Sequence, residues 1–454
     1  MNRNEEYMRL LETLEDIPDA LETTVERVVT RRQALQKKWR ILGVPSGSFA
    51  ACFIGFVLLV NLFPTFAYAC GGVPVLRELA KALAWSPSLS AAVENEYVQP
   101  IGISQTQNGI TATIEYLIVD QKQVNIFYTL KGDYEDLSGR KVEVSPEQHC
   151  SVAYGGAPNA PGTIQDIRLD YVDREVPAGF SVTIGVTSMD EEVNEPPQHY
   201  VKDEMLELGQ ENEPDYLAEF TFDLRFDPTF TATGETIPVN QTIELDGQDI
   251  TISEAQVYPT HVRINVKYHD ENSAWLKGLE FYLENEHGKT FEPISNGITA
   301  TGSENTNSYV SFRLESTYFA RSEHLTLYIT GSEWLDKDRE TIHLDLAAET
   351  ADYLPEDVVF KSAEKRDKGW ILEFRAKKRE EDHIHQVFYT TYLDAEGEEY
   401  SMRGYSNYTD YEDETYAYFI EELPLPDYHE TEVWLKPTYT HTATEETPVV
   451  IPIK

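Results

Sequence analysis

The chain has few cysteines and lacks the short motifs that mark many catalytic and nucleotide-binding sites. Three cysteines in 454 residues exclude a disulfide framework and a cysteine-rich zinc module. The sequence contains no P-loop, no G-x-G-x-x-G, no G-x-S-x-G elbow and no H-E-x-x-H. Carboxylates are so abundant that no pair of them stands out as a catalytic dyad. We therefore predict a protein that is not an enzyme, with no catalytic residue, no cofactor and no metal site.

Basic residues are scarce after the first 40 positions. Residues 1–40 hold 8 basic and 8 acidic side chains, residues 41–70 hold none, and residues 71–454 hold 29 basic against 71 acidic ones. The net charge of -42 therefore belongs to the last part of the chain. Such a surface repels nucleic acid, which we exclude as a partner of this part, and the acid excess is typical of a soluble region facing a saline or alkaline exterior.

Three polar patterns suggest metal ligands without specifying a site. Asp190–Glu192 and Glu412–Glu414 lack the spaced oxygen ligands and the turn glycine of an EF-hand loop, and solvated loops account for them. His383 and His385 would share one face of a strand, but no third ligand can be assigned to them. An exposed strand explains the histidine pair equally well.

One long uncharged run interrupts the chain between Ile41 and Cys70. Its clean part, from Ile41 to Phe63, has 23 residues and as a helix would span about 34 Å. Every Lys or Arg of the first 63 residues precedes the run. The positive-inside rule then predicts a single transmembrane helix over residues 41–63 in the cell membrane, with residues 1–40 in the cytoplasm and the C-terminal region outside.

Other interpretations of this run agree less well with its position and composition. A cleaved signal peptide would have its apolar core much closer to Met1. Ala67–Cys70 has the look of a cleavage or lipidation site, but Tyr68 fits it poorly and the preceding segment is too long. A buried helix of a soluble protein would carry more polar residues on one face.

Two cysteines, Cys70 and Cys150, fall on the predicted exterior side, whereas Cys52 lies in the predicted span. An oxidising compartment would let the two pair if the fold brings them close. The sequence leaves this pairing open.

The exterior part begins with an amphipathic stem and continues as strands and turns. Leu79 and Leu83, with Val75 and Leu76, are spaced to cover one face of a helix, which we expect to seat the exterior part at the bilayer. After about Tyr97 the chain is rich in Val, Ile, Thr, Tyr and Phe, with Gly, Asn, Asp and Pro between the runs. This texture predicts a mainly β fold.

An internal repeat divides the β region. Ile110–Tyr128 aligns without a gap with Ile250–Tyr268, and a weaker third copy covers Val358–Phe374. Phe281–Gly288 likewise resembles Thr391–Gly397, two strand ends that run into glycine turns. Units of about 100 to 130 residues with many short strands favour tandem immunoglobulin-like sandwiches.

The predicted organisation follows from these patterns and from polar stretches that serve as linkers. It consists of a helical tail (1–40), a transmembrane helix (41–63), a juxtamembrane stem (64–96) and three β domains (97–213, 214–350 and 351–454), the second and third of them immunoglobulin-like.

The tail carries two predicted amphipathic helices separated by Ile17-Pro18. Forty residues cannot bury a core of their own, so these apolar faces must lie on the membrane or dock on a partner. Docking accounts for the acidic first helix as well as the basic second one, whereas anionic headgroups suit only the second. The candidate partner-binding residues are Leu10, Leu14, Ile17, Leu21, Val25 and Val28.

Taken together, these features resemble a known family. The motif carriers are Ile17-Pro18-x-x-Leu21 in the tail, Phe66–Ala69 after the span, Val73–Leu76 in the stem and Asn108–Thr111 in the first hairpin. The arrangement resembles the single-pass anti-sigma-factor-like proteins of Gram-positive bacteria, whose exterior parts belong to uncharacterised, immunoglobulin-like domains of unknown function. The tail lacks the His and paired Cys of the zinc-containing anti-sigma factors, which excludes that subclass.

The resemblance implies a membrane-anchored regulator. Residues 1–40 would bind an extracytoplasmic-function sigma factor, and the exterior part would sense an envelope signal by binding an unknown extracellular ligand or protein, or would shield a cleavage site near residues 63–72. The alternative is a cell-surface binding or structural protein in which the tail is only a passive anchor. A secreted enzyme is a third interpretation, for which no residue can be nominated.

Overall fold

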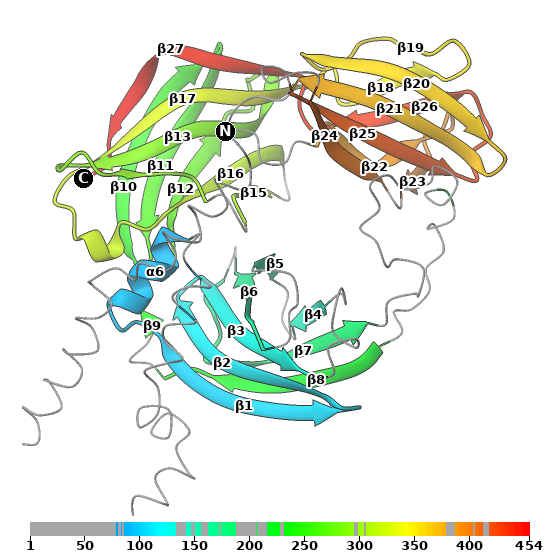
Figure 1. Cartoon of the computed structure of the whole chain (residues 1–454). Coiled ribbons are helices and arrows are strands. Elements are labelled where there is room, and N and C mark those ends of the chain that lie inside the picture. Colours follow the sequence, from blue (N-terminus) through cyan, green and yellow to red (C-terminus); the bar gives the residue numbers. More distant parts are fainter. Residues whose placement is uncertain are drawn as a thin grey trace, which may run out of the picture.

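The fold was analysed in a computed structural model of the 454-residue chain (Figure 1). The structure describes residues 79, 83, 86–132, 142–146, 150–155, 162–171, 174–187, 206, 216–227, 231–294, 298–303, 306–377, 386–402, 405–411 and 417–454. Within these residues the chain is mainly β, as predicted, with one α-helix, α6 (Pro87–Glu94), before the first strand. The strands form six sheets, which pair into three units.

Unit 1 has one large sheet and one small sheet that share a core. The large sheet has the strand order β1-β2-β3-β6-β5, with β9 beside β2, and the small one has the order β4-β7-β8. In β8 the buried residues Ala218, Phe220, Phe222 and Leu224 alternate with exposed polar ones, as a strand with one covered face requires. The bounds are β1 (Gln99–Gln107), β2 (Ile110–Asp120), β3 (Gln123–Lys131), β4 (Val142–Pro146), β5 (Ser151–Gly155), β6 (Ile164–Asp170), β7 (Gly179–Thr187), β8 (Tyr216–Arg225) and β9 (Thr231–Ala232).

Unit 2 packs a sheet of order β10-β11-β12-β16-β15 against one of order β14-β13-β17-β27. Its core includes Ile252 and Ile264 from the first sheet and Leu283 and Leu327 from the second. The bounds are β10 (Glu235–Leu245), β11 (Gln248–Val257), β12 (Val262–Tyr268), β13 (Ala274–Asn285), β14 (Thr290–Phe291), β15 (Ala300–Ser303), β16 (Thr306–Leu314), the 3-10 helix η2 (Tyr318–Ala320), β17 (Leu325–Asp336) and β27 (His441–Pro452).

Unit 3 repeats the two-sheet arrangement with orders β19-β18-β26-β22-β23 and β20-β21-β25-β24. Leu344 and Leu435 of the first sheet meet Leu372 and Phe374 of the second in its core. The bounds are β18 (Ile342–Asp345), β19 (Thr350–Ala351), β20 (Val358–Arg366), β21 (Gly369–Lys377), β22 (Phe388–Leu393), β23 (Glu399–Ser401), β24 (Ser406–Tyr411), β25 (Ala417–Pro426) and β26 (Glu432–Pro437).

Strand pairing places the unit boundaries elsewhere than after residues 213 and 350, where the sequence predicted them. β8 begins after residue 213 but pairs along the whole of β7, and β18 precedes residue 350 but pairs with β26. The last strand, β27, leaves unit 3 and lies beside β17, so that Ile451 enters the core of unit 2 (Figure 1). The composition of the polar linkers could not predict these pairings, because a strand can pair with another that is distant in the sequence.

The three copies of the repeat are hairpins of the same kind. Ile110–Tyr128 forms most of β2 and β3, Ile250–Tyr268 forms most of β11 and β12, and Val358–Phe374 lies within β20 and β21. Each pairing has one register shift, at Ile114/Tyr116 in the first copy and Ile252/Glu254 in the second. A register shift moves the side chains that follow it to the opposite face of the strand. Apolar side chains of β2 therefore lie on its outer face as well as in the core of unit 1.

That outer face is covered by α6. Ser86 precedes the helix as its N-cap, Pro87 occupies the first turn, and Leu89 and Val93 are buried against Tyr116. Leu79 and Leu83, two of the residues predicted for the stem face, are fully buried in the same cluster. The part of the stem that the structure describes is therefore packed on the β units.

The predicted transmembrane helix over residues 41–63 and the predicted tail lie outside the described residues. Among the residues that are described, no helix is long and apolar enough to cross a membrane.

Candidate functional site

The candidate site is the joint where α6, unit 1 and unit 2 meet, hereafter the stem joint. Two hairpins of the internal repeat touch here: the turn after β2 in unit 1 and the turn after β11 in unit 2. The ends of β6 and β16 lie beside them, and Figure 1 shows α6 between the two units. Its polar residues are Ser88 of α6, Asp120, Lys122, Arg168 and Asp170 of unit 1, and Thr260, His261, Arg263, Arg313, Glu315 and Ser316 of unit 2.

Asp120 connects the two hairpin turns. Its Oδ1 accepts hydrogen bonds from the backbone N–H groups of Lys122 and Gln123, both at 2.8 Å, which holds its own turn. Its Oδ2 accepts from Thr260 Oγ1 at 2.5 Å and from the Thr260 N–H at 3.3 Å. Asp120 and Thr260 occupy the same position in the two aligned repeats, so equivalent turns face each other.

Asp170 forms the second connection. Its Oδ1 lies 2.9 Å from Arg263 Nη2, and its two oxygens lie 2.9 and 3.1 Å from Arg313 Nε and Nη2. All three side chains are at most 3% exposed. A two-pronged arginine–carboxylate contact fixes the orientation of both partners, and removing one partner of such a buried set leaves an uncompensated charge.

The stem helix is tied to unit 2 through Ser88. The Ser88 N–H donates to Glu315 Oε2 at 2.7 Å, the Ser88 hydroxyl also bonds that oxygen, and the Ser316 N–H donates to Ser88 Oγ at 2.6 Å. An aromatic contact adds to this, because the rings of Tyr97 and Phe319 lie 5.9 Å apart. One turn of α6 therefore contacts unit 2 while its other side packs on unit 1.

Burial shifts the pKa values of the ionisable groups in the stem joint. It raises the pKa of Asp120 and of Glu315 above their ordinary values, against the opposing effect of their hydrogen bonds. It lowers the pKa of Arg313 and, together with the charges of Arg263, Arg313 and Lys122, holds the pKa of His261 well below its usual range. The imidazole of His261 is therefore neutral in this structure, in which the stem joint is closed.

A second joint, between units 2 and 3, is centred on Lys277 of β13. Its Nζ donates to the Asn307 carbonyl at 2.8 Å, to Asn307 Oδ1 at 2.9 Å and to the Tyr389 hydroxyl of unit 3 at 3.0 Å. Burial lowers the pKa of Lys277 to about 8. Three acceptors satisfy the ammonium group, which indicates a structural role.

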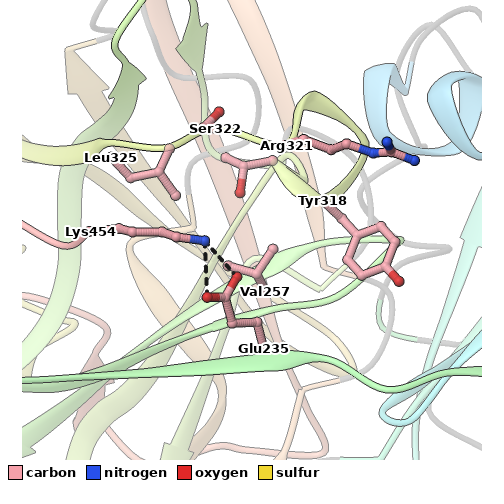
Figure 2. Close-up of a pocket in the computed structure, with 8 residues that line it drawn as sticks. Glu235, Val257, Tyr318, Arg321, Ser322, Leu325 and Lys454 are labelled. Carbon is pink, nitrogen blue, oxygen red and sulfur yellow. Dashed lines mark hydrogen bonds and ion pairs between the residues drawn. The ribbon is translucent and has the colours of Figure 1, made fainter.

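A pocket of about 280 Å³ lies next to η2 (Figure 2). It is lined in part by Glu235, Val257 and Tyr318, and Lys454 Nζ pairs with Glu235 there at 2.9 and 3.0 Å. The two charged groups that face each other in the pocket are thus paired together. Tyr318 lines the pocket, whereas the next residue, Phe319, packs against the cluster that holds α6.

Two regions of the chain match domain families of unknown function. Residues 37–132 match a domain of unknown function, DUF4179, and residues 234–357 match a family of unknown function, DUF5643. The first region ends just after β3, and the second extends from just before β10 to just before β20. The prediction that the chain contains domains of unknown function is confirmed. Asp120 and Ser88 lie in the first matched region, and Thr260, His261 and Glu315 lie in the second.

Whole-chain comparisons add little. No curated protein matches the chain. A solved structure, described as the crystal structure of the conserved domain protein from Bacillus anthracis, is 11% identical, with a TM-score of 0.37, and the match covers 56% of this chain and 84% of that one. A likeness at this TM-score carries no argument about fold or function.

The candidate residues predicted from sequence are not among the described residues. The tail positions Leu10, Leu14, Ile17, Leu21, Val25 and Val28 lie outside them, as do His383, His385 and both acidic clusters. The described residues contain no group of three or more His, Cys, Asp or Glu side chains that could hold a metal ion. Cys150 is half-buried, and burial raises the pKa of its thiol to about 11, but Cys70 lies outside the described residues.

Sequence reasoning missed the stem joint. A partial signal was present, because the repeat alignment sets Asp120 opposite Thr260. Arg263 and Arg313 gave none, because both occupy the polar positions of alternating strands, opposite the core residues Ile264 and Phe312, where an exposed side chain is expected. The partner of such a charge cannot be read from local pattern.

Proposed function

We propose that the chain is a membrane-anchored regulator, an anti-sigma factor whose cytoplasmic tail binds an extracytoplasmic-function sigma factor. The exterior units, which we assign as immunoglobulin-like sandwiches, sense an envelope signal. The uncharged run and its basic flank support the anchor, and the motif resemblance supports the sigma factor as partner. The observation that carries the proposal is the fixation of the stem helix between two units.

This fixation offers a route from the exterior to the membrane. Ser88 lies 25 residues after Phe63, the end of the expected span, and contacts Glu315 and Ser316 of unit 2. The same helix buries Leu89 and Val93 against unit 1. A movement of unit 1 relative to unit 2 must therefore break contacts of α6, and the released stem then changes what the single helix transmits or exposes.

The chemistry of the stem joint suits a contact that opens and closes. Inside each unit, the core is formed by apolar strands, which separate only on unfolding. The connections across the joint are instead mostly hydrogen bonds and ion pairs, whose groups water can solvate when they part. Interfaces of this polar kind permit relative motion of domains.

The test is co-purification of the sigma factor encoded beside this gene with the full-length chain, tagged at its C-terminus. We expect the wild-type chain to retain the sigma factor. The double variant Leu14→Ser, Val25→Ser removes one apolar side chain from each tail helix, and we expect it to retain at most about a tenth as much, because each loss removes about 1.5–3 kcal/mol of burial.

The matched control is Glu12→Gln, Thr23→Ser, which alters the opposite faces of the same helices and should bind like the wild type. The proposal fails if the wild-type chain retains no sigma factor. It also fails if both double variants retain it equally, because then the predicted apolar faces do not bind it.

A further inference from the structure

The hydrogen bonds around His261 run in one direction only. Arg263 Nε lies 2.9 Å from His261 Nε2, and an arginine Nε always carries a hydrogen. His261 Nε2 must therefore accept, which places the single imidazole hydrogen on Nδ1. Nδ1 lies 2.8 Å from Thr260 Oγ1, so that hydroxyl accepts from His261 and donates its own hydrogen to Asp120 Oδ2. This series of hydrogen bonds leads from Arg263 in unit 2 to the Asp120 carboxylate in unit 1.

These hydrogen bonds leave no acceptor for a second hydrogen on His261. Both nitrogens of His261 are engaged, and both oxygens of Asp120 already accept two hydrogen bonds each. His261 and Asp120 are both completely buried. A second proton on His261 would place an N–H at Nε2 against the N–H of Arg263, two positive groups 2.9 Å apart with no acceptor between them.

The charges facing His261 come from several elements. Unit 1 contributes Asp120, whose Oδ2 lies 3.8 Å from Nδ1, and Lys122 from the same turn. Unit 2 contributes Arg263 from β12 and Arg313 from β16, with the Tyr258 ring 5.2 Å from the imidazole. Asp170 of β6 pairs with the two arginines, and Glu175 acts on Tyr258. The nearest carboxylate is engaged by Thr260, so the three cations dominate at His261.

We propose that the stem joint is a proton-operated latch, which opens when His261 takes up a second proton in a mildly acidic exterior. Opening separates Thr260 from Asp120 and gives the imidazolium ion access to water. The latch is a property of the joint between units 1 and 2. Its effect on the cytoplasmic tail rests on the proposed function.

The direction of the pH dependence follows from proton linkage. In the open joint His261 has its ordinary pKa of 6.5, whereas in the closed joint its pKa lies well below that. The open state therefore binds more protons below pH 6.5, and the open-to-closed ratio rises by up to about tenfold per pH unit. Burial raises the pKa values of Asp120 and Glu315 in the closed joint, so proton uptake by these two carboxyl groups favours closure and opposes the effect of His261. The latch thus operates in a window that begins near pH 6.5.

The test is hydrogen exchange of the full-length chain in a lipid nanodisc, followed by mass spectrometry at pH 7.5, 6.5 and 5.5. The reporting amides are those of Thr260 and Ser316, which donate across the joint, and rates are corrected for the pH dependence of an unstructured peptide. We expect their protection to fall about fivefold between pH 6.5 and 5.5. The buried strand amides of Val182 and Ile184 in β7 should keep theirs. Unchanged protection of Thr260 and Ser316 overturns the proposal.

A variant pair isolates the residue. His261→Gln retains one acceptor and one donor but cannot take a proton in this range, and we expect it to lose the pH dependence. His269→Gln is the control, because His269 belongs to the same unit, is half-buried and bonds Thr251 within that unit. It should respond to acid like the wild type. If His261→Gln responds to acid as the wild type does, His261 is not the trigger.

Histidine C2-hydrogen exchange of the wild-type chain provides a measurement that needs no variant. It reports the pKa of each imidazole, and a value for His261 near 6.5 in the closed joint would overturn the latch. Retention of the sigma factor at pH 7.5 and 5.5 is measured in parallel. A latch that opens without any change in retention supports the pH device and counts against its link to the tail.

Discussion

At the residue scale, buried charged side chains distinguish the joints between units from the apolar cores within them. Asp170, Arg263 and Arg313 are almost completely buried, and each is held by partners from the other unit. Such groups contribute little net stability compared with apolar side chains, but a misaligned partner is costly. They therefore fix the relative position of the units more than they strengthen it. Lys277, with three acceptors, does the same between units 2 and 3.

Glu421 of β25 is a buried charge of a different kind. It is 2% exposed, its Oε2 accepts from the Val387 N–H at 3.0 Å, and Oε1 has no hydrogen-bond partner among the described residues. Burial raises its pKa to about 7. Because the folded pKa is raised, its contribution to stability is complete below pH 4.5 and is lost as the pH rises through 7.

We therefore expect Glu421→Gln to stabilise unit 3 at pH 8 by about 2–3 kcal/mol and to have little effect at pH 4.5. The measurement is the free energy of opening from hydrogen exchange of β21 amides, with variant and wild type compared at the same pH. The control is Glu396→Gln on the surface of the same unit, which should change neither value. A variant that is equally stable or less stable than the wild type at pH 8 would show that the carboxylate has a partner.

At the scale of elements, the hairpins follow from sequence and their partners do not. The alternation of apolar and polar residues, with turn residues between the runs, predicted the hairpins β2–β3 and β11–β12. At two other predicted turns, Gly288 and Gly397 adopt the left-handed φ values of 72° and 82° that a tight turn needs. The return of β27 to β17 spans more than 100 residues of chain, and no local pattern encodes it. The same limit concealed the contact between the two hairpin turns.

The stem helix α6 is the element on which the proposed transmission depends. Ser88→Ala removes the hydroxyl that bonds Glu315 and accepts from the Ser316 N–H, leaving two buried polar groups without that partner. We expect the closed joint to lose about 1–3 kcal/mol, seen as faster hydrogen exchange of the α6 and Ser316 amides. Ser90→Ala is the control, because Ser90 Oγ bonds only the Leu83 carbonyl in the described structure and should leave Ser316 unchanged. Equal exchange at Ser316 in both variants would contradict the role of Ser88.

At the scale of the whole molecule, three two-sheet units with apolar cores are connected by polar joints. The chain enters unit 3 after β17 and returns to unit 2 as β27, so two chain segments connect units 2 and 3. One short segment, between β9 and β10, connects units 1 and 2, which also meet through hydrogen bonds and ion pairs around α6. The stem joint is therefore the connection that can open without unfolding a core. It is also the one that holds the segment leading toward residues 41–63.

The measurement that tests the account most directly is transcription from promoters that depend on the sigma factor proposed as the partner. Cells carrying the full-length chain are compared with cells that lack the protein and with cells carrying a chain that lacks residues 2–30, a deletion that removes the six candidate partner-binding residues and keeps the basic segment 31–40. The account predicts that the tail deletion raises transcription to the level of cells without the protein, while the three β units remain folded. Transcription that stays at the level of the full-length chain would contradict it and would leave the tail as a passive anchor.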